Sequence, residues 1–138
     1  MKTLAFGKAG DCIVFVSGKH PLDNREWDDY ARFLKIELVP GVRTSCLIFT
    51  EGSGPTAAQR QLLNEVLAPV VHNAKAAVMT SSALARGIVT AMSWIYPVYK
   101  AFSPTETDEA IHFLGVSQHT VPKVKRLLYE LREDLYKP

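Results

Sequence analysis

The sequence predicts an α/β domain with a mixed, mostly parallel β-sheet, an N-terminal hairpin, helices covering the sheet and one helix appended at the C-terminus. Short apolar runs alternate with segments whose apolar residues recur every three or four positions, which is typical of strands and helices in βαβ units. The first two apolar runs are separated only by a glycine-containing turn, which indicates an antiparallel pair. The chain has 138 residues, of which 47% are hydrophobic, so it can bury a core.

The first elements are a hairpin and a helix. Two apolar runs at 3–6 and 12–16 have two glycines between them, which suits a hairpin. Asp23 or Asn24 can cap a helix over about 25–38. The apolar residues of this helix step by three and four and form one stripe; they are Trp27, Tyr30, Ala31, Leu34 and Leu38.

Two strand–turn–helix units follow the first helix. The apolar run 44–50 predicts a buried strand, and a helix is predicted from about 56 to 67. Thr56 and Gln59 have the spacing of a capping box at the start of that helix. Residues 76–80 predict the next short strand. The helix after it carries the apolar residues Leu84, Ile88, Met92 and Ile95.

A last strand, a helix and an appended helix complete the chain. Residues 96–102 predict the strand, and the segment 103–106, Ser-Pro-Thr-Glu, predicts a helix start that Gly115 ends. A further amphipathic helix is predicted at about 121–136. We therefore divide the chain into an α/β domain at 1–116 and a C-terminal amphipathic helix at 117–138. This helix could pack on its own domain or pair with a second copy in a homodimer.

Charge and composition argue against several classes of function. The formal net charge is +2 and no basic run is interleaved with aromatics, so we expect no nucleic-acid binding. No apolar run reaches the roughly 18 residues that cross a bilayer, and the N-terminus lacks the pattern of a signal peptide. We therefore expect a cytoplasmic protein that does not span a membrane.

Neither the histidines nor the cysteines predict a metal site or a cofactor. The histidines lack metal-ligand spacing; they are His20, His72, His112 and His119. Cys12 and Cys46 lie in apolar strands, so we expect buried free thiols. No carboxylate pair is placed for acid–base work, and we expect no enzyme, no cofactor and no metal.

Three sequence blocks and the order of elements resemble the STAS family (sulfate transporter and anti-sigma-factor antagonist), in its SpoIIAA-like branch, which is related to the lipid-binding Sec14 fold. The blocks are residues 49–60, 77–94 and the closing strand and helix within 100–115. The resemblance covers about 1–116. It implies a non-catalytic module that binds partner proteins, nucleotides or lipids. In the anti-sigma-factor antagonists a serine in a strand-to-helix Asp-Ser-Ser-Gly turn is phosphorylated to break a partner interface.

We expect the binding surface at the carboxyl ends of the parallel strands, beside helix N-termini. Free N–H groups and the helix dipole favour an anion there. Glycines permit close approach of the anion and arginines could clamp it. Alternatively, the serines only cap helices and the arginines are solvated or form structural ion pairs. The candidate residues are Gly52, Ser53, Gly54, Arg60, Ser81, Ser82 and Arg86.

Ser53 and Ser82 are the candidate phosphorylation sites. Residues 80–84 resemble the family's turn locally, with Thr80 in place of Asp, whereas the topology assigns the turn to 51–54. The first functional hypothesis is a regulatory protein-interaction module, such as a signalling adaptor with an unknown protein partner. The alternative is a domain that binds a small ligand, a lipid or a nucleotide. For that alternative an aromatic wall is available at Trp94, Tyr96 and Tyr99.

Overall fold

The apolar runs form one mixed sheet in the computed structural model, which describes residues 2–70, 74–95 and 98–137 and the side chains of these ranges except 91–95. The strand order follows the chain, with β1 and β2 antiparallel and each later neighbouring pair parallel. This confirms the predicted fold class. The strands are β1 (Leu4–Ala9), β2 (Cys12–Ser17), β3 (Thr44–Thr50), β4 (Ala74–Thr80) and β5 (Tyr99–Phe102).

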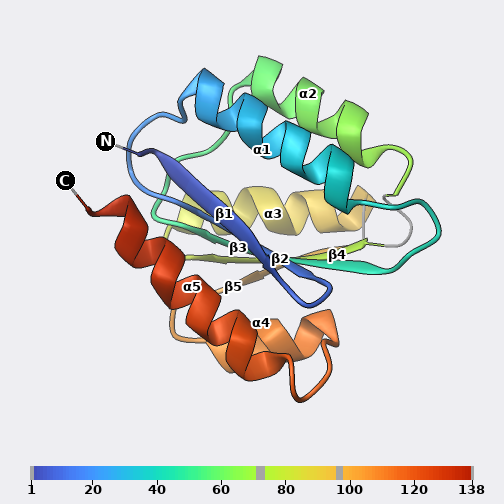
Figure 1. The fold of residues 1–138 in the computed structure, drawn as a ribbon. Helices are drawn as coiled ribbons and strands as arrows, with labels where there is room; N and C mark the ends of the chain where they lie inside the picture. Colours follow the sequence, from blue (N-terminus) through green and yellow to red (C-terminus); the bar gives the residue numbers. More distant parts are fainter. Residues whose placement is uncertain (1, 71–73, 96–97, 138) are drawn as a thin grey trace.

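Helices cover both faces of the sheet (Figure 1). Parallel crossovers are right-handed, so successive connections that move in one direction along a sheet place their helices on the same face. The three crossover helices accordingly share one face, and the two last helices share the other. The helices are α1 (Asn24–Glu37), α2 (Ala57–Leu67), α3 (Ala83–Ile95), α4 (Thr107–Leu114) and α5 (Val121–Leu135).

The sheet separates two apolar clusters, because successive side chains of a strand point to opposite faces. Strand β2 is buried at every position and contributes to both. Ile13 and Phe15 pack with the apolar stripe of α1, whereas Val14 and Val16 pack with α4 and α5. The same alternation places the two thiols on opposite faces, Cys12 in the α4–α5 cluster and Cys46 beside the α1–α2 cluster. Both cysteines are free, as expected, but only Cys12 is fully buried, since Cys46 is half-buried.

Helix α5 packs on its own sheet. Val124, Leu128 and Leu135 are buried in the same cluster as β1 and β2 residues. The helix also packs closely on β1, since a Cβ atom added at Gly7 would lie 3.2 Å from the Leu127 side chain. The first of the two alternatives for this helix is therefore observed, and its apolar stripe is used inside the molecule.

The helix termini follow the sequence except at α4. Asp23 accepts the N–H groups of the first turn of α1, and Thr56 forms the predicted capping box with Gln59. The predicted helix start at 103–106 is wrong. The Glu106 carboxylate accepts the N–H of Ser103 at 2.8 Å and closes a turn, so α4 begins only at Thr107.

Candidate functional site

A row of buried hydroxyl residues ends the three central strands. Ser17, Thr50 and Thr80 occupy neighbouring register positions at the last residue of β2, β3 and β4. All three are buried. Because these strands are parallel, the turns that follow them meet at one edge of the sheet, where the candidate residues were expected. We call this edge the carboxyl edge.

Thr50 shapes the turn after β3. Its hydroxyl donates to the carbonyl of Ser53 at 2.8 Å and accepts the N–H of Gly52 at 3.2 Å. Gly52 has a φ of +129°, which glycine adopts readily. The N–H of Ser53 donates to the carbonyl of Gly18 at 3.2 Å, while its hydroxyl oxygen is buried and has no hydrogen-bond partner. Ser53 is therefore a half-buried turn residue with a buried hydroxyl, and α2 is capped by Thr56 instead.

Thr80 shapes the turn after β4 in a related way. Its hydroxyl accepts the N–H of Ser82 at 3.2 Å. The Ser82 hydroxyl in turn accepts the N–H of Ala85 at 3.1 Å, which makes Ser82 the N-cap of α3. Ser81 beside it is exposed and Ser82 is half-buried. The capping alternative therefore holds for Ser82.

The two arginines each have their own surroundings. Arg60 donates to the carbonyl of Pro55 at 3.3 Å, at the start of its own helix. Arg86 is exposed near Glu106. Hydrogen bonds from Ser103 lower the pKa of that carboxyl, and the positive charge of Arg86 lowers it further. Both arginines are exposed, and these separate contacts do not bring them together as one anion clamp.

Glu51 is bound to the C-terminal end of α5. Its carboxylate accepts a hydrogen bond from the hydroxyl of Tyr136. This bond raises the pKa of Tyr136, because the neutral phenol donates and the phenolate would face a carboxylate. Glu51 thus links the turn after β3 to the C-terminal helix.

Gln59 is a buried polar residue whose full role the capping-box spacing does not reveal. Its side-chain amide donates to the carbonyl of Leu22 at 3.0 Å and to Asn24 at 2.9 Å. The backbone carbonyl of Gln59 accepts the indole N–H of Trp27 at 3.0 Å. These bonds fasten the first turn of α2 to the first turn of α1, and their only sequence signal is a glutamine three residues after a threonine.

An apolar cavity lies at the opposite, amino edge of the parallel strands. It measures about 90 Å³ and is lined by the first residues of β3, β4 and β5 and by α1 and α2. The Tyr30 hydroxyl and the Cys46 thiol, 4.0 Å apart, are among its few polar groups. Burial raises the pKa of Cys46 to about 11 and that of Tyr30 well above its usual value. Of the expected aromatic wall, Tyr99 lines the cavity, whereas the Trp94 side chain and Tyr96 lie outside the described residues.

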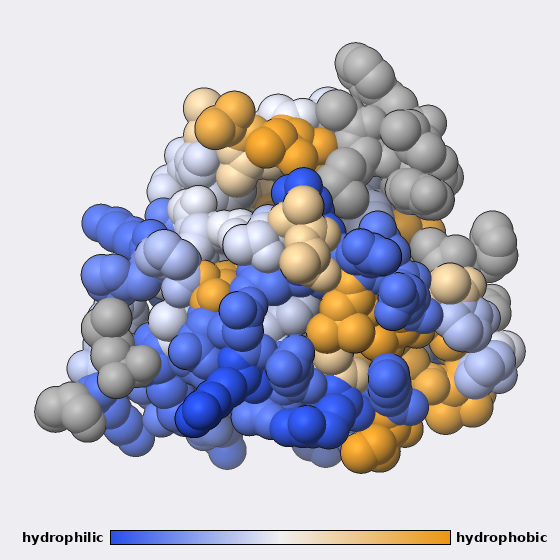
Figure 2. Space-filling model, turned by 90° about the horizontal axis from the view of Figure 1, so that it is seen from above, coloured by the Kyte–Doolittle hydropathy of each residue, from blue (hydrophilic) through white to orange (hydrophobic). Residues whose placement is uncertain are grey.

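Helix α3 presents apolar side chains to solvent. Leu84 is 77% exposed and Ile88, one turn later, is 54% exposed. The view in Figure 2 looks onto the face covered by the crossover helices, where hydrophobic areas stand beside largely hydrophilic surface. The exposed pair follows the Ser82 cap, and Arg86, which lies between them in the sequence, is exposed on another side of the helix. We call Ser81, Ser82, Leu84, Arg86 and Ile88 the α3 surface.

The part of the chain that the structure describes holds no group of three His, Cys, Asp or Glu side chains placed to bind a metal ion. Nor does any helix in the described ranges have the length and apolar character needed to cross a bilayer. Comparisons with protein-family models, with curated proteins and with solved structures find no match to this chain. The geometry of the carboxyl edge and of α3 is therefore the basis of the function proposed below.

Proposed function

We propose that this protein is a non-catalytic, regulatory protein-interaction module of the STAS/SpoIIAA-like type. The observation that carries the proposal is the α3 surface. Leu84 and Ile88 stand one turn apart on α3 and expose most of their apolar area. Exposed apolar side chains that stand together on one side of a helix are typical of an interaction surface.

The polar groups of the carboxyl edge support a binding role over a catalytic one. The hydroxyls of Thr50, Thr80 and Ser82 are used in hydrogen bonds that shape turns and cap α3. A general base or nucleophile needs a partner poised to take or give a proton. The role of these groups is to hold the neighbouring surface in shape.

Ser82 is the residue through which this surface would be regulated. A phosphate adds about −1.5 to −2 charges at neutral pH. At the N-cap of α3 that charge meets the positive end of the helix dipole and lies close to Arg86, so the domain tolerates it. A partner that presents apolar or acidic groups to Leu84 and Ile88 would be repelled.

The test compares matched substitutions of exposed apolar residues. The double variant Leu84→Asp and Ile88→Asp should lower the affinity for a partner, captured by the wild-type chain and then purified, by about tenfold or more. Ile36 on α1 is 77% exposed, the same as Leu84, so Ile36→Asp is the control. Equal affinities for the wild type and the double variant, at equal melting temperatures, would refute the proposal that the partner binds to the α3 surface.

The cavity supports a second candidate, a site for a small apolar ligand. Its lining is almost wholly apolar, and its volume of about 90 Å³ suits a small hydrocarbon group better than a whole lipid. Native mass spectrometry of freshly purified protein, followed by titration with benzene monitored at Tyr30 and Cys46 by NMR, tests this. No added mass and no shift at these residues would exclude it.

A further inference from the structure

The outer edge of β1 carries unpaired backbone groups whose direction the hairpin register fixes. Residues paired across an antiparallel ladder alternate between hydrogen-bonded and non-hydrogen-bonded pairs. The N–H of Gly18 donates to the carbonyl of Thr3 at 3.3 Å, so Thr3 begins the bonded set. The N–H and C=O groups of Leu4, Phe6 and Lys8 therefore point away from β2, toward the free edge.

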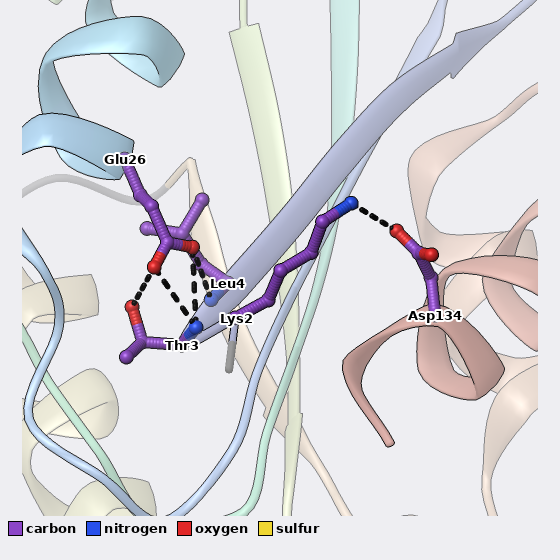
Figure 3. Close-up of polar contacts among 5 residues, drawn as sticks. All are labelled: Lys2, Thr3, Leu4, Glu26 and Asp134. Atoms are coloured by element: carbon purple, nitrogen blue, oxygen red, sulfur yellow. Dashed lines mark hydrogen bonds and ion pairs between the residues drawn. The ribbon is translucent and has the colours of Figure 1, made fainter. Parts of the chain in front are cut away.

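One of these outward groups is already satisfied. The Glu26 carboxylate accepts the N–H groups of Thr3 at 3.1 Å and of Leu4 at 3.3 Å (Figure 3). In the described ranges the outward N–H and C=O groups of Phe6 and Lys8 have no hydrogen-bond partner, and neither does the carbonyl of Leu4. The edge thus offers two donors and three acceptors in the spacing of a strand.

The edge lies in a groove between two helices. The groove measures about 270 Å³ and is lined by the first half of β1, by α1 and by α5. Figure 3 shows the start of β1 with Glu26 of α1 on one side and Asp134 of α5 on the other. Leu4, Phe6 and Leu131 supply its apolar lining. An extended chain placed here would be contacted from both sides as well as along its backbone.

The charges of the groove specify what kind of chain fits. The ionisable groups that line it are the carboxylates of Glu26, Asp29 and Asp134 and the ammonium group of Lys2, and Arg32 forms an ion pair with Asp29. Three carboxylates against two cations leave a small excess of negative charge. Lys2 contacts Asp134 at 2.5 Å, and the pKa of Asp134 is lowered mainly by this hydrogen bond. A second copy of this chain would bring the same carboxylates toward the groove, and like charges are unfavourable there. A basic segment complements it.

We propose that the β1 edge binds an extended, basic peptide segment of a partner protein as a sixth strand of the sheet. Backbone bonds to Phe6 and Lys8 supply the affinity, and alternating apolar and Lys or Arg side chains supply the selectivity. Helix α3, which carries the α3 surface, packs on β4 and β5 at one end of the sheet, whereas β1 is the opposite edge. The two surfaces are therefore independent, and either can be refuted alone.

The test uses a synthetic probe and leaves the protein unaltered. A blocked peptide in which Val and Lys alternate over about seven residues matches the length of an ordinary strand. Two further peptides carry N-methyl groups on alternate residues: one is methylated at the N–H groups that face β1, the other at the N–H groups that face away. The first peptide should bind about tenfold or more weakly than the parent peptide, because it loses several hydrogen bonds to β1. The second should bind as the parent does. Amide exchange at Phe6 and Lys8 should slow on binding.

A matched pair of charge variants tests the selectivity. Asp134→Asn frees Lys2 in the groove, and Asp108→Asn on α4 frees Lys125 on α5 by breaking a comparable exposed pair. The first should weaken binding of the Val–Lys peptide by about two- to fivefold at low salt, and the second should leave it unchanged. A peptide alternating Val and Glu should bind more weakly than either. No binding of the Val–Lys peptide, equal losses for both N-methylated sets, or a free protein that is a dimer paired through β1 would each overturn the proposal.

Discussion

At the scale of single residues, the buried Gln59 joins two helices by hydrogen bonds from the start of α2 to the start of α1. It is 4% exposed and bonds to Leu22, Asn24 and the backbone of Thr56. The capping box could be predicted from the spacing of Thr56 and Gln59. The bonds to the α1 region could not, because they join residues more than thirty positions apart that only the folded chain brings together.

We predict that Gln59→Ala lowers the free energy of unfolding by about 2–3 kcal/mol, because it leaves the Leu22 carbonyl and the Thr56 N–H without their partner. Gln61 is exposed two positions along the same helix, so Gln61→Ala is the control and should change stability by about 0.5 kcal/mol or less. Urea unfolding of the three proteins measures both. Equal stabilities of the two variants would contradict the network.

We predict a loss of stability above pH 9 that arises at the thiols. Burial raises the pKa of Cys12 from 9.0 to about 12 and that of Cys46 from 9.0 to about 11. The unfolded chain therefore loses these protons first, so the stabilising contribution is complete below pH 9 and declines as the pH rises toward 11–12. Urea unfolding between these limits should show the decline, and it should be smaller in the Cys12→Ala, Cys46→Ala double variant. Identical pH profiles would contradict this account.

At the scale of elements, the C-terminal helix shows what an amphipathic pattern does and does not determine. The spacing predicted α5 and its apolar stripe, but the stripe alone was equally compatible with the helix's own sheet and with a second copy. The structure buries Val124 and Leu128 against β1 and β2. The site was harder to predict for a similar reason, because Glu106 beside Arg86 and Tyr136 on Glu51 are contacts between distant segments.

We predict that Leu128→Ala lowers the free energy of unfolding by about 2–4 kcal/mol, as for a buried leucine. Leu128 is 5% exposed, whereas its neighbour Tyr129 is 66% exposed, so Tyr129→Ala should have little effect on stability. Denaturant unfolding compares them. If Leu128→Ala unfolds like the wild type, α5 does not contribute to the core of this sheet.

At the scale of the whole molecule, the sheet order follows the chain and separates the functional surfaces. The fold class was predictable because strand and helix periods are local properties of the sequence. The cavity was not, since it depends on how the side chains of α1, α2 and the sheet fill the space between them. The carboxyl edge was placed correctly by the rule for parallel strands, but its serines differ in a way that only burial reveals. The Ser53 hydroxyl is buried without a hydrogen-bond partner among the described residues, whereas the Ser82 hydroxyl caps α3.

We predict from this difference that a negative charge at Ser82 weakens partner binding without lowering stability, whereas a negative charge at Ser53 lowers stability. Asp is a good N-cap, so Ser82→Asp should keep the bond to the Ala85 N–H and change the free energy of unfolding by about 0.5 kcal/mol or less. The hydroxyl of Ser53 is buried without a partner, so Ser53→Asp should cost about 2–3 kcal/mol, because it encloses an unpaired carboxylate. Urea unfolding measures both changes. Affinity for a partner captured through the α3 surface should then fall in Ser82→Asp but not in Ser82→Asn, which caps the helix without the charge. Partner binding that is equal in these two variants would leave Ser82 as a helix cap alone, with no regulatory role.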